Sequence, residues 1–132
     1  MHRRAVAERL TSISGSSRSF LGGAVVYSDQ LKTLFAGVPP SLIEAHGAVS
    51  KEVAGALAEG IRRNTNATFG LGVTGIAGPS GGSEEKPVGL VYVAVTDGKQ
   101  TQVVERRFGG DREHIRAWTS QLALDMVRRR LK

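Results

Sequence analysis

Two apolar runs separated by a tight turn limit the fold more than any other feature of this sequence. The runs "VGLVYVAVT" and "QTQVVERRF" flank Asp97, Gly98 and Lys99. Runs rich in β-branched residues on either side of an Asp-Gly turn predict a β-hairpin. The chain is therefore expected to build a sheet, and its other segments have to cover that sheet.

The remaining patterns predict helices together with two more strands. Helical spacing and capping residues predict helices over residues 3–13, 29–37, 40–47 and 50–64, with Ser50 as the N-cap of the fourth. Short runs of β-branched residues predict strands over about 21–27 and 68–74. This order of elements predicts an α/β fold in which helices are layered on a mixed sheet.

A last helix is expected after Asp111, which is a good N-cap. Its apolar face carries Ile115, Trp118, Leu122 and Met126 at helical spacing. We expect Trp118 to lie in the core.

The composition is that of a soluble globular protein, and residues 1–132 are expected to form one domain. The sequence has no apolar run long enough to span a membrane, and its first ten residues are too charged for a secretory signal. We therefore expect a cytoplasmic protein without a membrane partner.

The chain has no cysteine, which excludes disulfides, thiolate zinc sites and cysteine nucleophiles. Its three histidines are far apart in sequence and show no ligand spacing, so no metal site is predicted.

The net charge of +6 makes an anionic partner worth considering. The basic excess lies mostly at the two ends, in "HRR" and "RRRLK", where a solvated face explains it. Few aromatic residues accompany these charges, so a nucleic-acid surface is poorly supported.

The stretch "VTGIAGPSGGSEEKPVG", residues 73–89, is the candidate site, and we call it the glycine loop. Backbone without Cβ atoms can approach a ligand closely, and successive N–H groups can hold an anion. The residues expected to cradle a phosphate or oxyanion are Gly75, Gly78, Gly81 and Gly82, with the Thr74 hydroxyl before them and the Lys86 charge at the exit. A long surface turn is the alternative, because no helix follows the loop as it would in a P-loop or a dinucleotide site.

Three stretches resemble the C-terminal domain of the CinA family, the nicotinamide-nucleotide amidohydrolases. They are "LTSISGSSRSFLGGAVVYSDQLKTLFAGV", "HGAVSKEVAGALAEGIRR" and "VTGIAGPSGGSEEKPVGLVYVAV". The resemblance implies a three-layer α/β/α fold with a mixed β-sheet. It also implies hydrolysis of nicotinamide mononucleotide to nicotinate mononucleotide and ammonia by a serine and a lysine, in pyridine-nucleotide salvage, with no metal or cofactor.

The resemblance assigns roles to particular residues. Lys32 matches the lysine that activates the serine, and Thr74 matches the threonine of the loop. Tyr27, five residues before Lys32, matches the family's tyrosine and is expected to orient the amide or the lysine, with an ordinary strand aromatic as the alternative. A lysine in this role needs a depressed pKa, which burial would supply. A basic residue of the last helix that would hold the substrate matches either Arg112 or Arg116.

The sequence departs from the family where the serine should lie. The Glu-Ser-Cys-Thr-Gly-Gly motif has no counterpart, and the chain reads "MHRRAV" there. Ser28 is a poor substitute because it is well placed as an N-cap, and Ser80 and Ser83 suit turn positions better. The family's first helix and strand are expected to be missing, and we expect impaired catalysis as a result.

The alternative is a non-catalytic module that binds a nucleotide or a partner. Uncovered apolar surface also predicts a homo-oligomer or a marginally stable fold.

Overall fold

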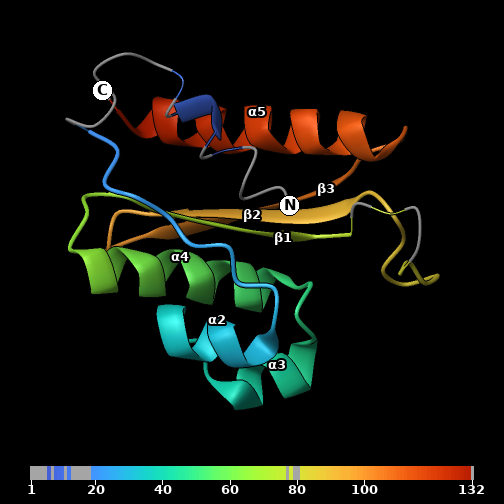
Figure 1. Ribbon diagram of the computed structural model, residues 1–132, viewed down its shortest axis with the longest axis horizontal. Helices are drawn as coiled ribbons and strands as arrows, with labels where there is room; N and C mark the ends of the chain where they lie inside the picture. Colours follow the sequence, from blue (N-terminus) through green and yellow to red (C-terminus); the bar gives the residue numbers. More distant parts are fainter. Residues whose placement is uncertain are drawn as a thin grey trace.

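A three-stranded antiparallel sheet lies between helices that cover both of its faces (Figure 1). The computed structural model describes residues 6, 8–10, 12, 19–76, 78 and 81–131. The strands are β1 (Gly70–Gly75), β2 (Leu90–Thr96) and β3 (Thr101–Arg107), in the order β1-β2-β3. The glycine loop joins β1 to β2, and the Asp-Gly turn joins β2 to β3, as the sequence predicts.

The helices form layers on either side of this sheet (Figure 1). They are α2 (Asp29–Ala36), α3 (Pro40–His46), α4 (Lys51–Thr65) and α5 (Arg112–Arg130). Helix α5 covers one face and α4 covers the other, while α2 and α3 pack on the outer side of α4. The predicted three-layer α/β/α arrangement is therefore confirmed, with α2 and α3 added outside it. Residues 6 and 8–10, in the first predicted helix, are helical, and Val6 and Leu10 pack into the apolar cluster beneath α5.

Small residues bring α4 and β1 unusually close together. A Cβ atom on Gly72 would overlap the Ala54 carbonyl oxygen of α4, and one on Gly70 would overlap that of Ala58. Both alanines are fully buried. The glycines of β1 therefore serve the packing of helix on sheet, while Val73 points to the opposite face, toward α5.

A strand is predicted over residues 21–27, and this prediction is wrong. The segment has no strand pairing, and the side chains of Leu21, Val25 and Tyr27 are exposed, whereas Val26 is buried against α2 and α3. Preference for a strand depends largely on packing against neighbouring strands, so a β-branched run alone does not place a segment in a sheet. All strand pairs among the described residues are antiparallel, so the expectation of a mixed sheet is not met there.

The prediction that Trp118 lies in the core is also wrong, because 57% of its surface is exposed. Ile115, Leu122 and Met126 do face the sheet, as expected. Trp118 falls at the margin of their stripe on the helical wheel. Thr119 takes the buried place instead, because its hydroxyl donates to the Ile115 carbonyl at 2.6 Å and is thereby satisfied within the helix.

Candidate functional site

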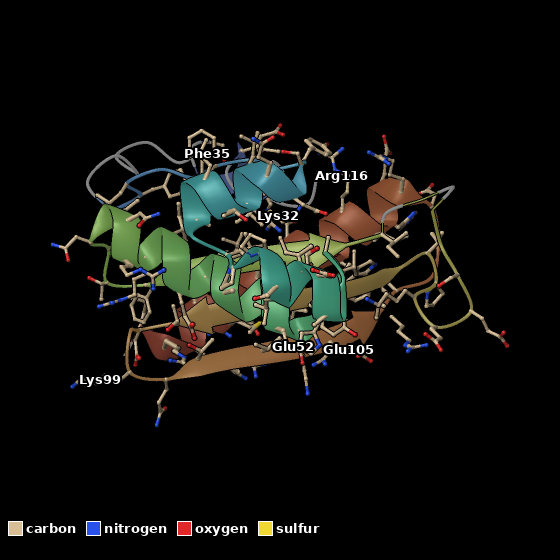
Figure 2. The ribbon with its side chains drawn as sticks, turned by 90° about the horizontal axis from the view of Figure 1, so that it is seen from below. Lys32, Phe35, Glu52, Lys99, Glu105 and Arg116 are labelled. Atoms are coloured by element: carbon tan, nitrogen blue, oxygen red, sulfur yellow. The ribbon has the colours of Figure 1, made fainter. Side chains whose placement is uncertain are left out.

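Lys32 is buried, which is unusual for a lysine. It lies on α2, which begins at the N-cap Ser28 and ends at Gly37 in the left-handed conformation. Its side chain is only 3% exposed, and Nζ donates to the Tyr27 carbonyl at 3.2 Å. The carboxylate of Asp29 lies 3.6 Å from the same ammonium. Figure 2 shows Lys32 on the inner side of α2, with Arg116 projecting from α5 in the neighbouring part of the view.

Tyr27 meets Lys32 through its backbone carbonyl, and Ser28 serves as the N-cap that the sequence predicts. The Tyr27 side chain is 67% exposed, and only its carbonyl meets Lys32. Ser28 acts as the expected N-cap, because its hydroxyl accepts from the backbone N–H of Leu31 at 3.0 Å. Among the described residues, neither side chain is bonded to the Lys32 ammonium.

Thr74 lies near the end of β1 and is fully buried. Its Oγ1 donates to the carbonyl of Ala48, 2.8 Å away in the turn between α3 and α4. Ala48 packs against the apolar cluster that contains Val26 and Ala36, which flank the segment that carries Lys32. Because the hydroxyl proton is committed to Ala48, the Thr74 oxygen can take part in a further hydrogen bond only as an acceptor.

Close packing explains three of the four glycines that are expected to cradle a ligand. A Cβ atom on Gly75 would approach Val91 Cγ1 to 2.6 Å, and one on Gly82 would approach the Val88 nitrogen to 2.7 Å. Gly78 has φ +79°, and its Cβ atom would approach Val88 Cγ1 to 2.5 Å. Gly81 has φ +95° and open space around it. Among the described residues, the N–H groups of Gly81 and Gly82 find no acceptor, so they remain candidates for an anion.

Arg112 and Arg116, the two alternatives for the basic residue of the last helix, differ in their hydrogen bonds. Arg112, in the first turn of α5, donates from Nη1 to the Gly78 carbonyl at 2.8 Å and so ties α5 to the glycine loop. The Nε atom of Arg116 is buried, yet it has no hydrogen-bond partner among the described residues. A buried polar atom without a partner is rare in folded proteins and asks for an explanation.

Asp111 caps the helix that carries both arginines. Its carboxylate accepts from the backbone N–H of His114 at 2.9 Å. This bond, with the His114 side chain, holds the pKa of Asp111 below its usual value. A charged cap therefore fixes the start of α5, and with it the position of Arg112 and Arg116.

The turn within the glycine loop uses Ser83, as the alternative interpretation of that serine predicts. Its hydroxyl accepts from the backbone N–H of Lys86 at 3.1 Å, and its own N–H donates to the Lys86 carbonyl at 2.8 Å. Ser80 and the serine-motif position at "MHRRAV" lie outside the described residues, apart from Val6.

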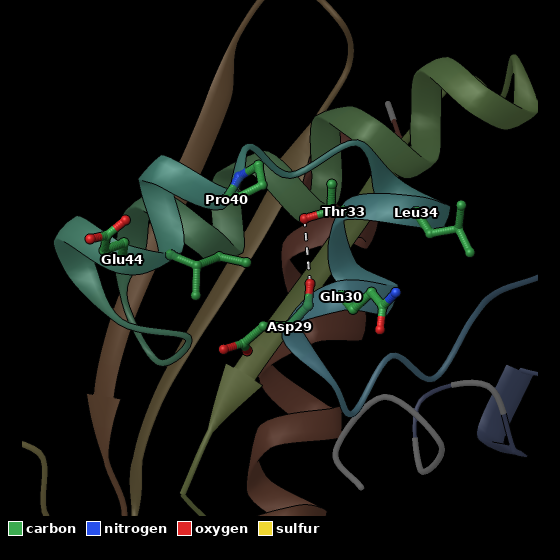
Figure 3. Close-up of a pocket in the computed structure, with 7 residues that line it drawn as sticks. Asp29, Gln30, Thr33, Leu34, Pro40 and Glu44 are labelled. Atoms are coloured by element: carbon green, nitrogen blue, oxygen red, sulfur yellow. Dashed lines mark hydrogen bonds between the residues drawn. The ribbon is translucent and has the colours of Figure 1, made fainter.

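Sequence reasoning did not predict the open groove on the outer side of α2 and α3 (Figure 3). Its volume is about 600 Å³, and it is lined by Asp29, Gln30, Thr33, Leu34, Pro40, Ile43 and Glu44. None of these residues is in the glycine loop. The groove is therefore distinct from the candidate site, although Asp29 also pairs with Lys32.

The described residues contain no group of three or more His, Asp or Glu side chains arranged to hold a metal ion. No described helix is both long and apolar enough to cross a membrane.

Comparison with known proteins places this geometry in a family. The sequence matches the CinA C-terminal domain over residues 5–131. The chain belongs to the CinA C-terminal domain family. It is 68% identical over 126 residues to a CinA-like protein of Koribacter versatilis (strain Ellin345), covering 96% of the chain and 30% of that protein. It is 50% identical over 127 residues to a putative competence-damage inducible protein of Moorella thermoacetica, covering 96% of the chain and 31% of that protein. The chain thus spans about 30% of the length of these curated relatives.

Solved structures of CinA proteins share the fold. The competence damage-inducible protein A of Klebsiella pneumoniae superimposes with a TM-score of 0.93 at 28% identity, covering 98% of the chain and 81% of that protein. The competence/damage inducible protein of Agrobacterium tumefaciens superimposes with a TM-score of 0.88 at 38% identity, covering 96% and 78%.

Proposed function

We propose that this CinA domain is a cytoplasmic nicotinamide-nucleotide amidohydrolase of pyridine-nucleotide salvage. It would hydrolyse the carboxamide of nicotinamide mononucleotide to the carboxylate and release ammonia. The burial of Lys32 is the observation that carries the proposal. Lysine activates a nucleophile only where its surroundings disfavour the charged ammonium, and a lysine in bulk water does not meet that requirement.

Thr74 supports a substrate with a carboxamide. Its oxygen is oriented as an acceptor by the bond to Ala48. A carboxamide offers two N–H donors to such an acceptor, whereas a carboxylate offers none. Thr74 would therefore favour the amide substrate over the acid product.

Arg116 and the loop support a nucleotide. A phosphate accepts strong charge-assisted hydrogen bonds from a guanidinium, and the unpartnered Nε of Arg116 is available for one. The N–H groups of Gly81 and Gly82 add neutral donors on the loop. Arg112 is already bound to Gly78, so we assign it to holding the loop.

The sequence contains no Glu-Ser-Cys-Thr-Gly-Gly motif, and this limits the expected rate. Loss of a nucleophile costs several powers of ten in kcat and leaves only the acceleration from binding and oxyanion contacts. We therefore propose that residues 1–132 by themselves supply the nucleotide pocket and the activating lysine, and that turnover by these residues alone is slow. A non-catalytic module that binds a nucleotide or an acidic partner is the second candidate.

Calorimetry and an ammonia assay test the proposal together. We expect micromolar binding of nicotinamide mononucleotide to the chain, and ammonia release that rises strongly when the serine motif is added upstream. Absence of nucleotide binding, or tight and salt-sensitive binding of nucleic acid, would favour the second candidate.

An Arg116→Met variant tests the phosphate contact. We expect affinity for nicotinamide mononucleotide to fall about 10-fold or more, because a charge-assisted hydrogen bond is lost. Affinity for nicotinamide riboside, which lacks the phosphate, should not change. Arg63→Met, on the exposed last turn of α4, is the matched control and should bind both ligands normally. An equal loss for both ligands in Arg116→Met would contradict the assignment.

We also propose that the chain forms a homo-oligomer. Leu21, Val25, Tyr27, Leu34 and Phe35 are all exposed and fall within fifteen residues of sequence. Concentrated exposed apolar side chains commonly mark a protein interface. Light scattering should give a mass of at least two chains, and a heat-stable monomer would contradict this proposal.

A further inference from the structure

The turn between α3 and α4, residues 46–50, is bonded on two sides by distant parts of the chain. Thr74 Oγ1 donates to the Ala48 carbonyl at 2.8 Å, and Lys86 Nζ donates to the His46 carbonyl at 2.7 Å. Within the turn, Ser50 Oγ donates to the Gly47 carbonyl at 2.8 Å. One short turn therefore links the end of β1, the exit of the glycine loop and the start of α4.

Gly47 leaves the space beside the α3–α4 turn that the Lys86 ammonium occupies. Gly47 has φ +82°, and a Cβ atom on it would lie 2.7 Å from Lys86 Nζ. Gly47 is the C-cap of α3, where unpaired carbonyl groups carry partial negative charge and attract a cation. Lys86 thus caps α3 across 40 residues of sequence.

We propose that Lys86 is a positioning residue that holds the α3–α4 turn and, through Ala48, orients the hydroxyl of Thr74. The sequence suggested a charge at the loop exit that contacts the ligand, but the ammonium is bonded to the protein itself. With the turn fixed, the Ala48 carbonyl fixes the Thr74 proton, and the acceptor side of Thr74 faces the ligand. The link from Thr74 to the substrate carboxamide rests on the proposed function. The link from Lys86 to the turn does not.

Hydrogen exchange of the ligand-free protein tests the structural link by itself. In Lys86→Met, which removes the ammonium and keeps a long unbranched side chain, we expect the amides of residues 47–50 to exchange about tenfold faster or more. Lys99→Met is the matched control, because Lys99 is exposed in the β2–β3 turn at the other end of the sheet (Figure 2). Unchanged exchange at residues 47–50 in Lys86→Met would overturn the proposal, whether or not the protein binds a nucleotide.

Ligand preference tests the second link. We expect Lys86→Met to reduce the preference for nicotinamide mononucleotide over nicotinate mononucleotide about tenfold, because a displaced acceptor loses the carboxamide N–H. Thr74→Val should show the same loss, and the double variant should lose no more than Thr74→Val alone. Additive losses would overturn the positioning role. The positioning role would also be overturned if Lys86→Met weakened binding of both mononucleotides and left binding of nicotinamide riboside unchanged. That result would mean direct contact between Lys86 and the phosphate. If the unaltered protein binds neither nucleotide while exchange at residues 47–50 still responds to Lys86→Met, the proposed function fails and the turn-holding role stands.

Discussion

Replacing Gly60 with alanine is expected to destabilise the fold by about 3 kcal/mol or more, or to prevent folding. Gly60 lies in α4 where α2 crosses it, and a Cβ atom there would overlap the backbone carbonyl of Ala36. The overlap is with backbone, so no change of side-chain rotamer relieves it and the helices have to move apart. The gain of about 1 kcal/mol in helix propensity is too small to compensate. Urea unfolding measures the difference in the free energy of unfolding.

Gly55→Ala is the matched control in the same helix. Its Cβ atom would lie 3.7 Å from Val103 Cγ2, an ordinary van der Waals distance. The same substitution should therefore stabilise the protein by up to about 1 kcal/mol, through helix propensity alone. Equal effects of the two substitutions would show that the close approach of α2 and α4 does not limit stability.

Lys32→Met is expected to lower the rate of ammonia release about 100-fold or more, in whichever form of the protein shows activity. The amine that would accept the proton of the nucleophile is gone, while a side chain of similar length fills the space. Stability should change little, because removing a buried polar group offsets the loss of the bond to the Tyr27 carbonyl. Ammonia release and urea unfolding, measured on the same preparation, separate the two effects.

Lys32→Arg tests whether Lys32 acts as a base or only through its positive charge. Arginine keeps a positive charge but does not lose its proton in proteins, so it cannot serve as a base. This variant should be as inactive as Lys32→Met, whereas Lys99→Met should keep full activity. An active Lys32→Arg variant would mean that Lys32 acts only through its charge.

Elements with local signals could be predicted from the sequence. Ser50 accepts from the Val53 N–H and starts α4, and the turn at Asp97 and Gly98 joins β2 to β3, as expected. Both signals are complete within a few residues, because a cap and a tight turn satisfy the backbone groups beside them. Helices α2 and α3 likewise end at glycines that the sequence shows.

Features that depend on distant partners could not be predicted. The run over 21–27 has the composition of a strand, but a strand forms only where a neighbour pairs with it. Gly78 and Arg112 are 34 residues apart, and Lys86 and His46 are 40 apart, so neither bond leaves a pattern in the sequence. The glycines of the loop were assigned to a ligand, whereas three of them fit closely against Val88 or Val91. The burial of Lys32 is expected only from the resemblance to the family.

The outer strand β3 also affects how the protein behaves in concentrated solution. Exposed strand edges recruit other chains into growing sheets, and natural proteins oppose this with charge. Along β3, Gln102, Glu105, Arg106 and Arg107 are all exposed. Two copies that approached each other along this strand would have to bring Glu105, Arg106 and Arg107 of both chains into the contact without partners of fixed geometry. Fibril growth through β3 is therefore disfavoured, and the hairpin that defines the sheet also limits its extension.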